Sequence, residues 1–132
     1  EVSNIYIEVG NSMVRANSIT NADPDTNIEV HFSEAMDNTS ITVNTSNASC
    51  SGTVRVSSDG FSSCVQMSSS SPSISNTNKI FTFDPSSNLN DGETYLIRVT
   101  TGAKDGSGVS FSTIYTISSG FSCDGKVNSN CK

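Results

Sequence analysis

The chain has 132 residues, a formal charge of −6 and a pI of about 4.4, which fits one domain and excludes binding of nucleic acid or anionic membranes through basic residues. Val and Ile supply 21 residues and Leu and Ala only 7, whereas Ser, Thr and Asn supply 54. β-Branched residues favour strands, and Ser, Thr and Asn favour turns over helix interiors. The composition therefore excludes a helical bundle and predicts an all-β domain.

Short segments in which apolar and polar residues alternate, separated by turn residues, predict the strands. The clearest segment is residues 28–32, where every second side chain is apolar and Glu29 and His31 point outward. Residues 13–19 are expected to continue the first strand along an edge. The predicted strands lie, in chain order, at residues 5–9, 28–32, 40–43, 53–57, 64–67, 79–83, 94–100 and 110–117.

Two polar segments and the end of the chain lie outside this pattern. Residues 68–78 consist almost entirely of Ser, Asn, Pro and Thr, which predicts a surface loop, and residues 50–64 are predicted to form an insertion. Because the strand pattern stops after Ile117, residues 1–120 are assigned to one domain. Residues 121–132 are assigned to a polar C-terminal tail or linker that the fold does not require. No apolar run approaches the roughly 18 residues of a membrane span, so this segment is not expected to enter a membrane.

The spacing of strands and turns describes a known architecture. Short strands with turn residues at intervals of roughly ten residues are typical of an immunoglobulin-like β-sandwich of about seven to nine antiparallel strands. A barrel with a similar number of strands is the alternative that the pattern leaves open. The chain has no Trp, so the Cys-Trp-Cys core of antibody domains is absent.

The four cysteines include no Cys-x-x-Cys pair. In a short polar chain they indicate an oxidising compartment and disulfides rather than a thiolate metal site. Four cysteines allow three connectivities, of which proximity along the chain favours Cys50 with Cys64 and Cys123 with Cys131. The expected location is therefore extracellular or the outer surface of a cell.

Several segments are similar to one family. Residues 32–37, Phe-Ser-Glu-Ala-Met-Asp, resemble the phrase that ends the second strand of bacterial Ig-like domains of the surface-layer-protein type. Further matches follow in that family's order and approximate spacing, at Phe83-Asp84-Pro85, Leu89, residues 92–99 and Asp105-x-x-Gly108. The resemblance covers about residues 28–117, and the Ser-rich style looks like the copies found in spirochaete surface proteins.

This resemblance implies a β-sandwich from the outside of a bacterial cell, in which Phe32, Met36 and Phe83 have structural roles. Tyr95 follows a Gly-containing turn and looks like a tyrosine corner. Its hydroxyl is expected to bond to a main-chain group a few residues upstream.

The residues needed for catalysis are missing from the sequence. His31 is the sole histidine, and its outward position on a strand predicts a solvated side chain. A serine hydrolase needs a nucleophile elbow and a base, and zinc sites use several His or Cys ligands, none of which the pattern supplies. The chain is therefore not expected to be an enzyme.

Calcium is the one cofactor for which the sequence offers ligands. Asp23, Asp25 and Asn27 lie in one loop and Asp105 in another, and calcium prefers oxygen ligands in loops. The EF-hand spacing fails because Ile28 occupies the position that needs Gly. The competing interpretation is that these residues cap main-chain groups in Asx turns.

The sequence thus predicts a non-catalytic module of a secreted or cell-surface bacterial protein, serving adhesion or partner binding or acting as a structural spacer. A protein or glycan partner is expected, with residues 50–64 and 68–78 as the candidate contact segments. The alternative is an accessory carbohydrate-binding module of an extracellular hydrolase, which an exposed row of aromatic rings would favour. Phe111, Thr113 and Tyr115 share one predicted strand face, which is more simply explained as core or as a strand-edge contact. The lack of Trp also counts against this alternative.

Overall fold

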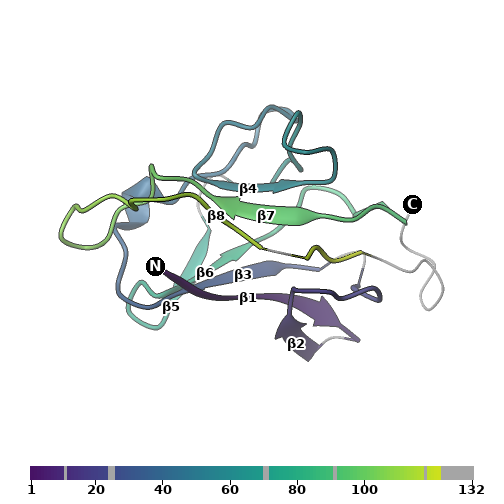
Figure 1. The fold of residues 1–132 in the computed structure, drawn as a ribbon, viewed down its shortest axis with the longest axis horizontal. Helices are drawn as coiled ribbons and strands as arrows, with labels where there is room; N and C mark the ends of the chain where they lie inside the picture. Colours follow the sequence, from purple (N-terminus) through teal and green to yellow (C-terminus); the bar gives the residue numbers. More distant parts are fainter. Residues whose placement is uncertain (11, 24–25, 70–71, 91, 118, 123–132) are drawn as a thin grey trace.

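The computed structural model describes residues 1–10, 12–23, 26–69, 72–90, 92–117 and 119–122. Two antiparallel sheets form the molecule (Figure 1), with strand orders β2-β1-β3-β6-β5 and β4-β7-β8. The elements are β1 (Val2–Val9), β2 (Ser12–Arg15), β3 (Ile28–Phe32), η1 (Asn38–Ser40), β4 (Val54–Ser57), β5 (Ser73–Ser75), β6 (Ile80–Phe83), β7 (Leu96–Val99) and β8 (Tyr115–Thr116). The prediction of an immunoglobulin-like β-sandwich is confirmed. The described part of the chain has no helix long and apolar enough to cross a membrane.

One apolar core fills the space between the two sheets. In β3 the buried residues alternate with half-buried Glu29 and His31, as the period of two requires. Burying each large aliphatic or aromatic side chain stabilises the fold by roughly 1.5–3 kcal/mol. The strands contribute Ile5, Ile7, Ile28, Val30, Phe32, Phe81 and Phe83 from the five-stranded sheet and Val54, Val56, Ile97 and Val99 from the three-stranded sheet.

Residues 40–43 do not form the predicted strand. Asp37 caps the η1 turn, accepting the main-chain N–H of Thr39 at 3.0 Å, so the chain enters this segment from a 3-10 turn. Beyond it the main-chain N–H groups of Thr42 and Thr53 each bond to the hydroxyl of the other residue. Hydroxyls accept these two bonds, and the Val54 N–H is the only described main-chain donor that bonds to a carbonyl of this segment, that of Thr42 at 3.0 Å, so the segment lies beside β4 without joining its sheet.

Residues 64–67 also lack the predicted strand. The N–H groups of Cys64 and Met67 donate to the carbonyls of Ala48 and Asn44, whereas the N–H of Val65, between them, donates to Val56 on β4. These bonds cannot build a ladder with a single neighbour.

The Ser-rich segment at residues 68–78, predicted to be a loop, contains strand β5. Ser73, Ile74 and Ser75 pair with β6 and form an outer edge of the five-stranded sheet. All three residues are exposed, which explains why an inward apolar period is missing from the sequence. The turn to β6 places residues 76–78 at positive φ, which two of them tolerate because they are Asn.

The C-terminal end of the domain lies further along the chain than the strand pattern indicated. Phe121 is fully buried in the core, although the boundary at residue 120 assigned it to the tail. Its main chain exchanges two hydrogen bonds with Tyr95, of 2.7 and 3.0 Å. A Cβ on Gly120 would lie 2.5 Å from the carbonyl oxygen of Tyr95, so glycine permits this close approach. Residues 121–122 therefore belong to the sandwich.

This position of Phe121 predicts that residues after 120 cannot simply be removed. Phe121→Ala leaves a cavity in the core, and we expect the free energy of unfolding to fall by about 3–5 kcal/mol. Urea unfolding of the intact chain measures the change. Ile114→Ala, at a side chain that is 55% exposed, is the control and should change stability by about 0.5 kcal/mol or less. A loss below about 1 kcal/mol for Phe121→Ala would restore the boundary at residue 120.

Candidate binding surfaces

The outer face of the five-stranded sheet carries one row of side chains that crosses all five strands. Strand register aligns Arg15, Tyr6, Glu29, Thr82 and Ser73 in this order. Asn4, His31 and Ile80 form the next row along the strands. The face is therefore mainly polar, with Tyr6 and His31 as its rings.

His31 packs against its neighbours on this face. Its Nε2 lies 2.9 Å from Glu29 Oε1, and its ring centroid lies 4.5 Å from that of Tyr6 at a tilt of 54°. The side chains of His31 and Glu29 are only 25% and 27% exposed. The predicted outward position of His31 is thus correct, but the ring is mostly covered rather than freely solvated.

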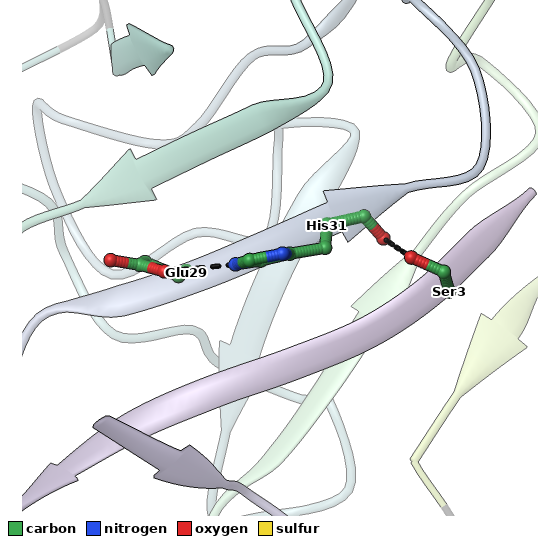
Figure 2. Close-up of polar contacts among 3 residues, drawn as sticks. All are labelled: Ser3, Glu29 and His31. Atoms are coloured by element: carbon green, nitrogen blue, oxygen red, sulfur yellow. Dashed lines mark hydrogen bonds and ion pairs between the residues drawn. The ribbon is translucent and has the colours of Figure 1, made fainter. Parts of the chain in front are cut away.

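Ser3 completes a group that resembles a Ser-His-acid arrangement when seen in Figure 2. The Ser3 hydroxyl, however, donates to the main-chain carbonyl oxygen of His31 at 3.1 Å and not to its ring. A triad requires the hydroxyl proton to point at the imidazole nitrogen. This geometry gives Ser3 no general base.

Cys50 and Cys64 form a disulfide that closes a segment containing β4 and the loop after it, with Cα atoms 5.0 Å apart. Inside the loop, the Asp59 carboxylate accepts bonds from the Ser63 hydroxyl, the Ser63 N–H and the Ser57 hydroxyl. These bonds, chiefly those from Ser63, lower the pKa of Asp59 to about 2. Residues 50–64 are thus not a simple insertion, because they include the core strand β4, and the loop that follows β4 is held by these internal bonds.

The same loop is also fixed to the three-stranded sheet. The Arg98 guanidinium of β7 lies 4.0 Å from the Phe61 ring centroid, and its Nε donates to the Thr116 hydroxyl of β8 at 3.1 Å. Outside the loop, Glu93 accepts bonds from the Ser58 hydroxyl and the Asn90 amide, which lower the pKa of Glu93. The polar side chains of Ser57, Ser58, Asp59 and Ser63 thus already form hydrogen bonds within the protein.

The calcium candidates do not converge. Asp23 precedes β3, and its Oδ1 accepts the Gly10 N–H at 2.9 Å. Asp105 bridges to Met36 beyond the other end of β3, and its Oδ1 accepts the N–H groups of Ser107 and Val109. The two loops lie at opposite ends of the strand, so they cannot share an ion.

Of the remaining members of the calcium set, only Asn27 lies within the described residues. The Asn27 N–H donates to the Glu8 carboxylate at 2.8 Å, and Asp25 lies outside the described residues. Within the described chain no group of three or more His, Cys, Asp or Glu residues is placed to hold a metal ion. The geometry of Asp23 and Asp105 fits capping of turns.

The four residues with predicted structural roles are buried. Phe32, Met36 and Phe83 are at most 3% exposed and belong to the core. Tyr95 is 3% exposed, and its hydroxyl accepts the Asn90 main-chain N–H at 2.8 Å, five residues upstream. This contact has the geometry of a tyrosine corner.

All nine aromatic residues lie within the described part of the chain, and each is buried or half-buried. Phe111 and Tyr115 are half-buried beside the core, and Thr113 between them is exposed. The exposed aromatic row that would favour a carbohydrate-binding module is therefore not formed in this part of the chain.

An open groove lies where the two sheets meet beside β8. It has a volume of about 570 Å³ and runs between the start of β1, at Glu1 and Val2, and residues 109–116. Glu34 and Asp105 also line it. Nothing in the sequence pattern pointed to this groove, because it forms between segments about 110 residues apart in the chain.

Comparison with known proteins agrees with this fold. Residues 7–122 match the family model of the bacterial Ig-like domain. The chain belongs to the bacterial Ig-like domain family. The resemblance seen in the sequence is therefore confirmed. No curated protein matches the chain.

Two solved structures share the fold. The crystal structure of the S-layer protein rSbsC(31-844) is 21% identical, with a TM-score of 0.54 over 85% of this chain and 14% of that one. The structure of surface layer protein SbsC, domains 1-6, is 20% identical, with a TM-score of 0.55 over 95% of this chain and 14% of that one. At these identities the likeness concerns the fold, and this chain spans about 14% of each neighbour's length.

The internal bonds of Asp59 predict a defined pH dependence. The folded pKa of about 2 lies below the unfolded value of about 3.8, so the stabilisation is complete above pH 3.8 and is lost as the pH falls through 2. Asp59→Asn should therefore destabilise the domain at pH 7 and flatten the fall in stability between pH 4 and 2. Urea unfolding at pH 7, 4 and 2.5 measures both effects. Ser63→Ala should reproduce part of the loss, and an unchanged pH profile in Asp59→Asn would contradict the assignment.

The disulfides predict both a peptide map and a stability loss. Peptide mapping without reductant should recover the Cys50–Cys64 link and a Cys123–Cys131 link, the latter pair lying outside the described residues. Replacing Cys50 and Cys64 by Ser should cost about 3 kcal/mol, because the unfolded loop regains its freedom. The Cys123→Ser, Cys131→Ser double variant is the matched control and should cost less. A peptide that joins residue 50 or 64 to residue 123 or 131 would refute this connectivity.

Proposed function

We propose that this domain is a non-catalytic module of a secreted or surface-bound bacterial protein, and that it presents a partner-binding surface on a rigid β-sandwich. The observation that carries the proposal is the family match over residues 7–122, which assigns nearly the whole described chain to one Ig-like unit. Such a scaffold hosts function on its loops, faces and edges. The fold shared with S-layer proteins supports an extracellular position.

The arrangement of polar groups supports binding rather than turnover. The sole histidine is held by Glu29 and Tyr6, and the neighbouring Ser3 hydroxyl is directed to a main-chain oxygen. A general base must reach the proton that it removes. These contacts leave His31 a structural role on the sheet face.

Rigidity supports a presenting role. The Cys50–Cys64 disulfide, the bonds to Asp59 and the Arg98–Phe61 contact fix the loop that follows β4 to the sandwich. A surface that is already ordered loses less conformational entropy when a partner binds. The same rigidity would suit a spacer between neighbouring domains, which is the competing role within this proposal.

Binding and turnover can be tested together. The purified chain should bind, saturably, at least one member of a panel of extracellular matrix proteins and bacterial or host glycans, and should release no product from glycans or peptides. Biolayer interferometry and product chromatography measure the two properties. Variants in which Gly-Ser linkers replace residues 58–62, the part of the first segment that follows β4, or residues 72–78, which include the exposed edge strand β5, test the two segments singled out from the sequence.

The outcomes separate the competing roles. Hydrolysis that disappears in His31→Ala would refute the non-catalytic assignment. A panel that shows no binding at all would refute the presenting role and leave the spacer. Binding that survives both loop replacements would move the contact surface to the faces and edges of the sheets.

A further inference from the structure

The segment before β8 has the sequence of a strand but lacks a strand's partners. Alternation predicts a strand over residues 110–117, whereas only Tyr115 and Thr116 pair with β7. The main-chain groups of residues 112–114 make no hydrogen bond to any other described residue. β8 is an edge of its sheet, so the donors and acceptors of residues 112–114 are available to another chain.

This unpaired segment also carries exposed apolar surface. Val109 is 62% exposed and Ile114 is 55% exposed, the two highest values among the exposed large hydrophobic residues described. The comparable residue on an edge of the other sheet, Ile74, is only 39% exposed and lies on β5, all three residues of which pair with β6 on one side. The edge beside β8 thus combines unpaired main chain with uncovered apolar side chains.

The groove of about 570 Å³ gives this edge a place for an added strand. The groove separates residues 109–116 from the start of β1, so a chain lying in it would contact both sheets. Its volume falls within the roughly 300–1,000 Å³ that is usual for ligand sites. Side chains of alternate residues in an added strand would point into it.

The negative charges around the groove favour a positively charged occupant. Glu1, Glu34 and Asp105 line it, and none of the described lining residues is Lys or Arg. One α-amino group, that of Glu1, lies at the rim and donates to the Ser33 hydroxyl. A second copy of this chain carries a charge of −6 and would be repelled, whereas a basic segment would be attracted.

We propose that the edge formed by residues 109–116 binds an extended, basic polypeptide segment by strand addition. Main-chain hydrogen bonds to residues 112–114 supply affinity, apolar side chains cover Val109 and Ile114, and basic side chains meet the carboxylates of the groove. This inference rests on the proposed presenting function, to which it adds a surface and the chemistry of the partner.

A peptide titration with the intact chain tests the inference. The probe is a ten-residue peptide of alternating Val and Lys, capped at both ends and labelled for fluorescence anisotropy. We expect saturable binding that weakens with added salt. The same peptide with Glu in place of Lys, or with N-methylated Val residues that cannot donate, should bind about tenfold more weakly or not at all.

Matched variants locate the site. Ile114→Lys places a charge on the proposed edge and should weaken binding about tenfold or more, whereas Ile74→Lys makes the same change on β5 and should leave binding unchanged. Glu34→Gln should weaken binding and reduce its salt dependence, and Glu29→Gln on the outer sheet face is its control. Hydrogen exchange should slow at the amides of residues 112–114 in the complex and not at residues 73–75.

Each other outcome overturns the inference in a distinct way. Equal binding of the Lys and Glu peptides would refute the charge selection. Loss of binding in Ile74→Lys but not in Ile114→Lys would move the site to β5. Binding of glycans or folded proteins without binding of the basic peptide would refute strand addition while leaving the presenting function intact. Absence of all binding would refute both.

Discussion

The fold depends most on one contact at the end of the sandwich, between Tyr95 and Phe121. The two rings are stacked with centroids 5.8 Å apart, and their main chains exchange two hydrogen bonds. On its other side the segment at residues 120–122 bonds to Ser18, Ile19 and Ala22, which follow β2. The contact therefore ties the segment after β2 of the five-stranded sheet to the residue that immediately precedes β7 of the three-stranded sheet. Both sheets are closed at this end by a segment of only three residues.

The same C-terminal stretch leaves the neighbouring part of the sandwich open. From Ile117 to Ser122 the chain bonds in turn to Ile97, Tyr95 and the segment after β2. Upstream of β8, residues 112–114 bond to no described neighbour. Only two residues of the edge strand, Tyr115 and Thr116, therefore pair with β7. The chain after β8 closes one end of the sandwich through its hydrogen bonds, whereas residues 112–114 before β8 make no such bonds within the described chain and leave the groove uncovered.

The sequence predicted the features that depend on local periodicity. Alternation at residues 28–32 placed Val30 in the core, and the family resemblance gave structural roles to Met36 and Tyr95, both of which are buried. The burial of Phe121 was not predicted, because this residue is flanked by Gly and Ser and belongs to no alternating pattern that would indicate an inward face. Strand β5 was not predicted for a related reason, since an edge strand that is exposed on both faces needs no alternation of apolar and polar residues. These two elements are defined by partners distant in the chain.

The candidate surfaces were predicted less well than the fold, for a physical reason. Residue types reveal which groups can bond but not which bonds are already made. Asp59, Asp23 and Asp105 all offer carboxylates, and in each case main-chain N–H groups or hydroxyls of the same region occupy them. The groove instead arises where bonds are missing, between the first residues of the chain and residues 109–116. Such a site is visible only once the partners of every neighbouring segment are known.

The distribution of hydrogen bonds also decides where recognition can occur on this molecule. A carboxylate that already accepts several internal bonds would have to exchange them for bonds to a ligand, with little net gain. This applies to Asp59 and Glu93 around the disulfide loop, whose lowered pKa values record how strongly their charged forms are already stabilised. An unpaired strand edge has the opposite balance, because its main-chain groups exchange only water when a partner strand arrives. The acidic loops therefore stabilise the scaffold, and the capacity for new contacts concentrates along the edge beside β8.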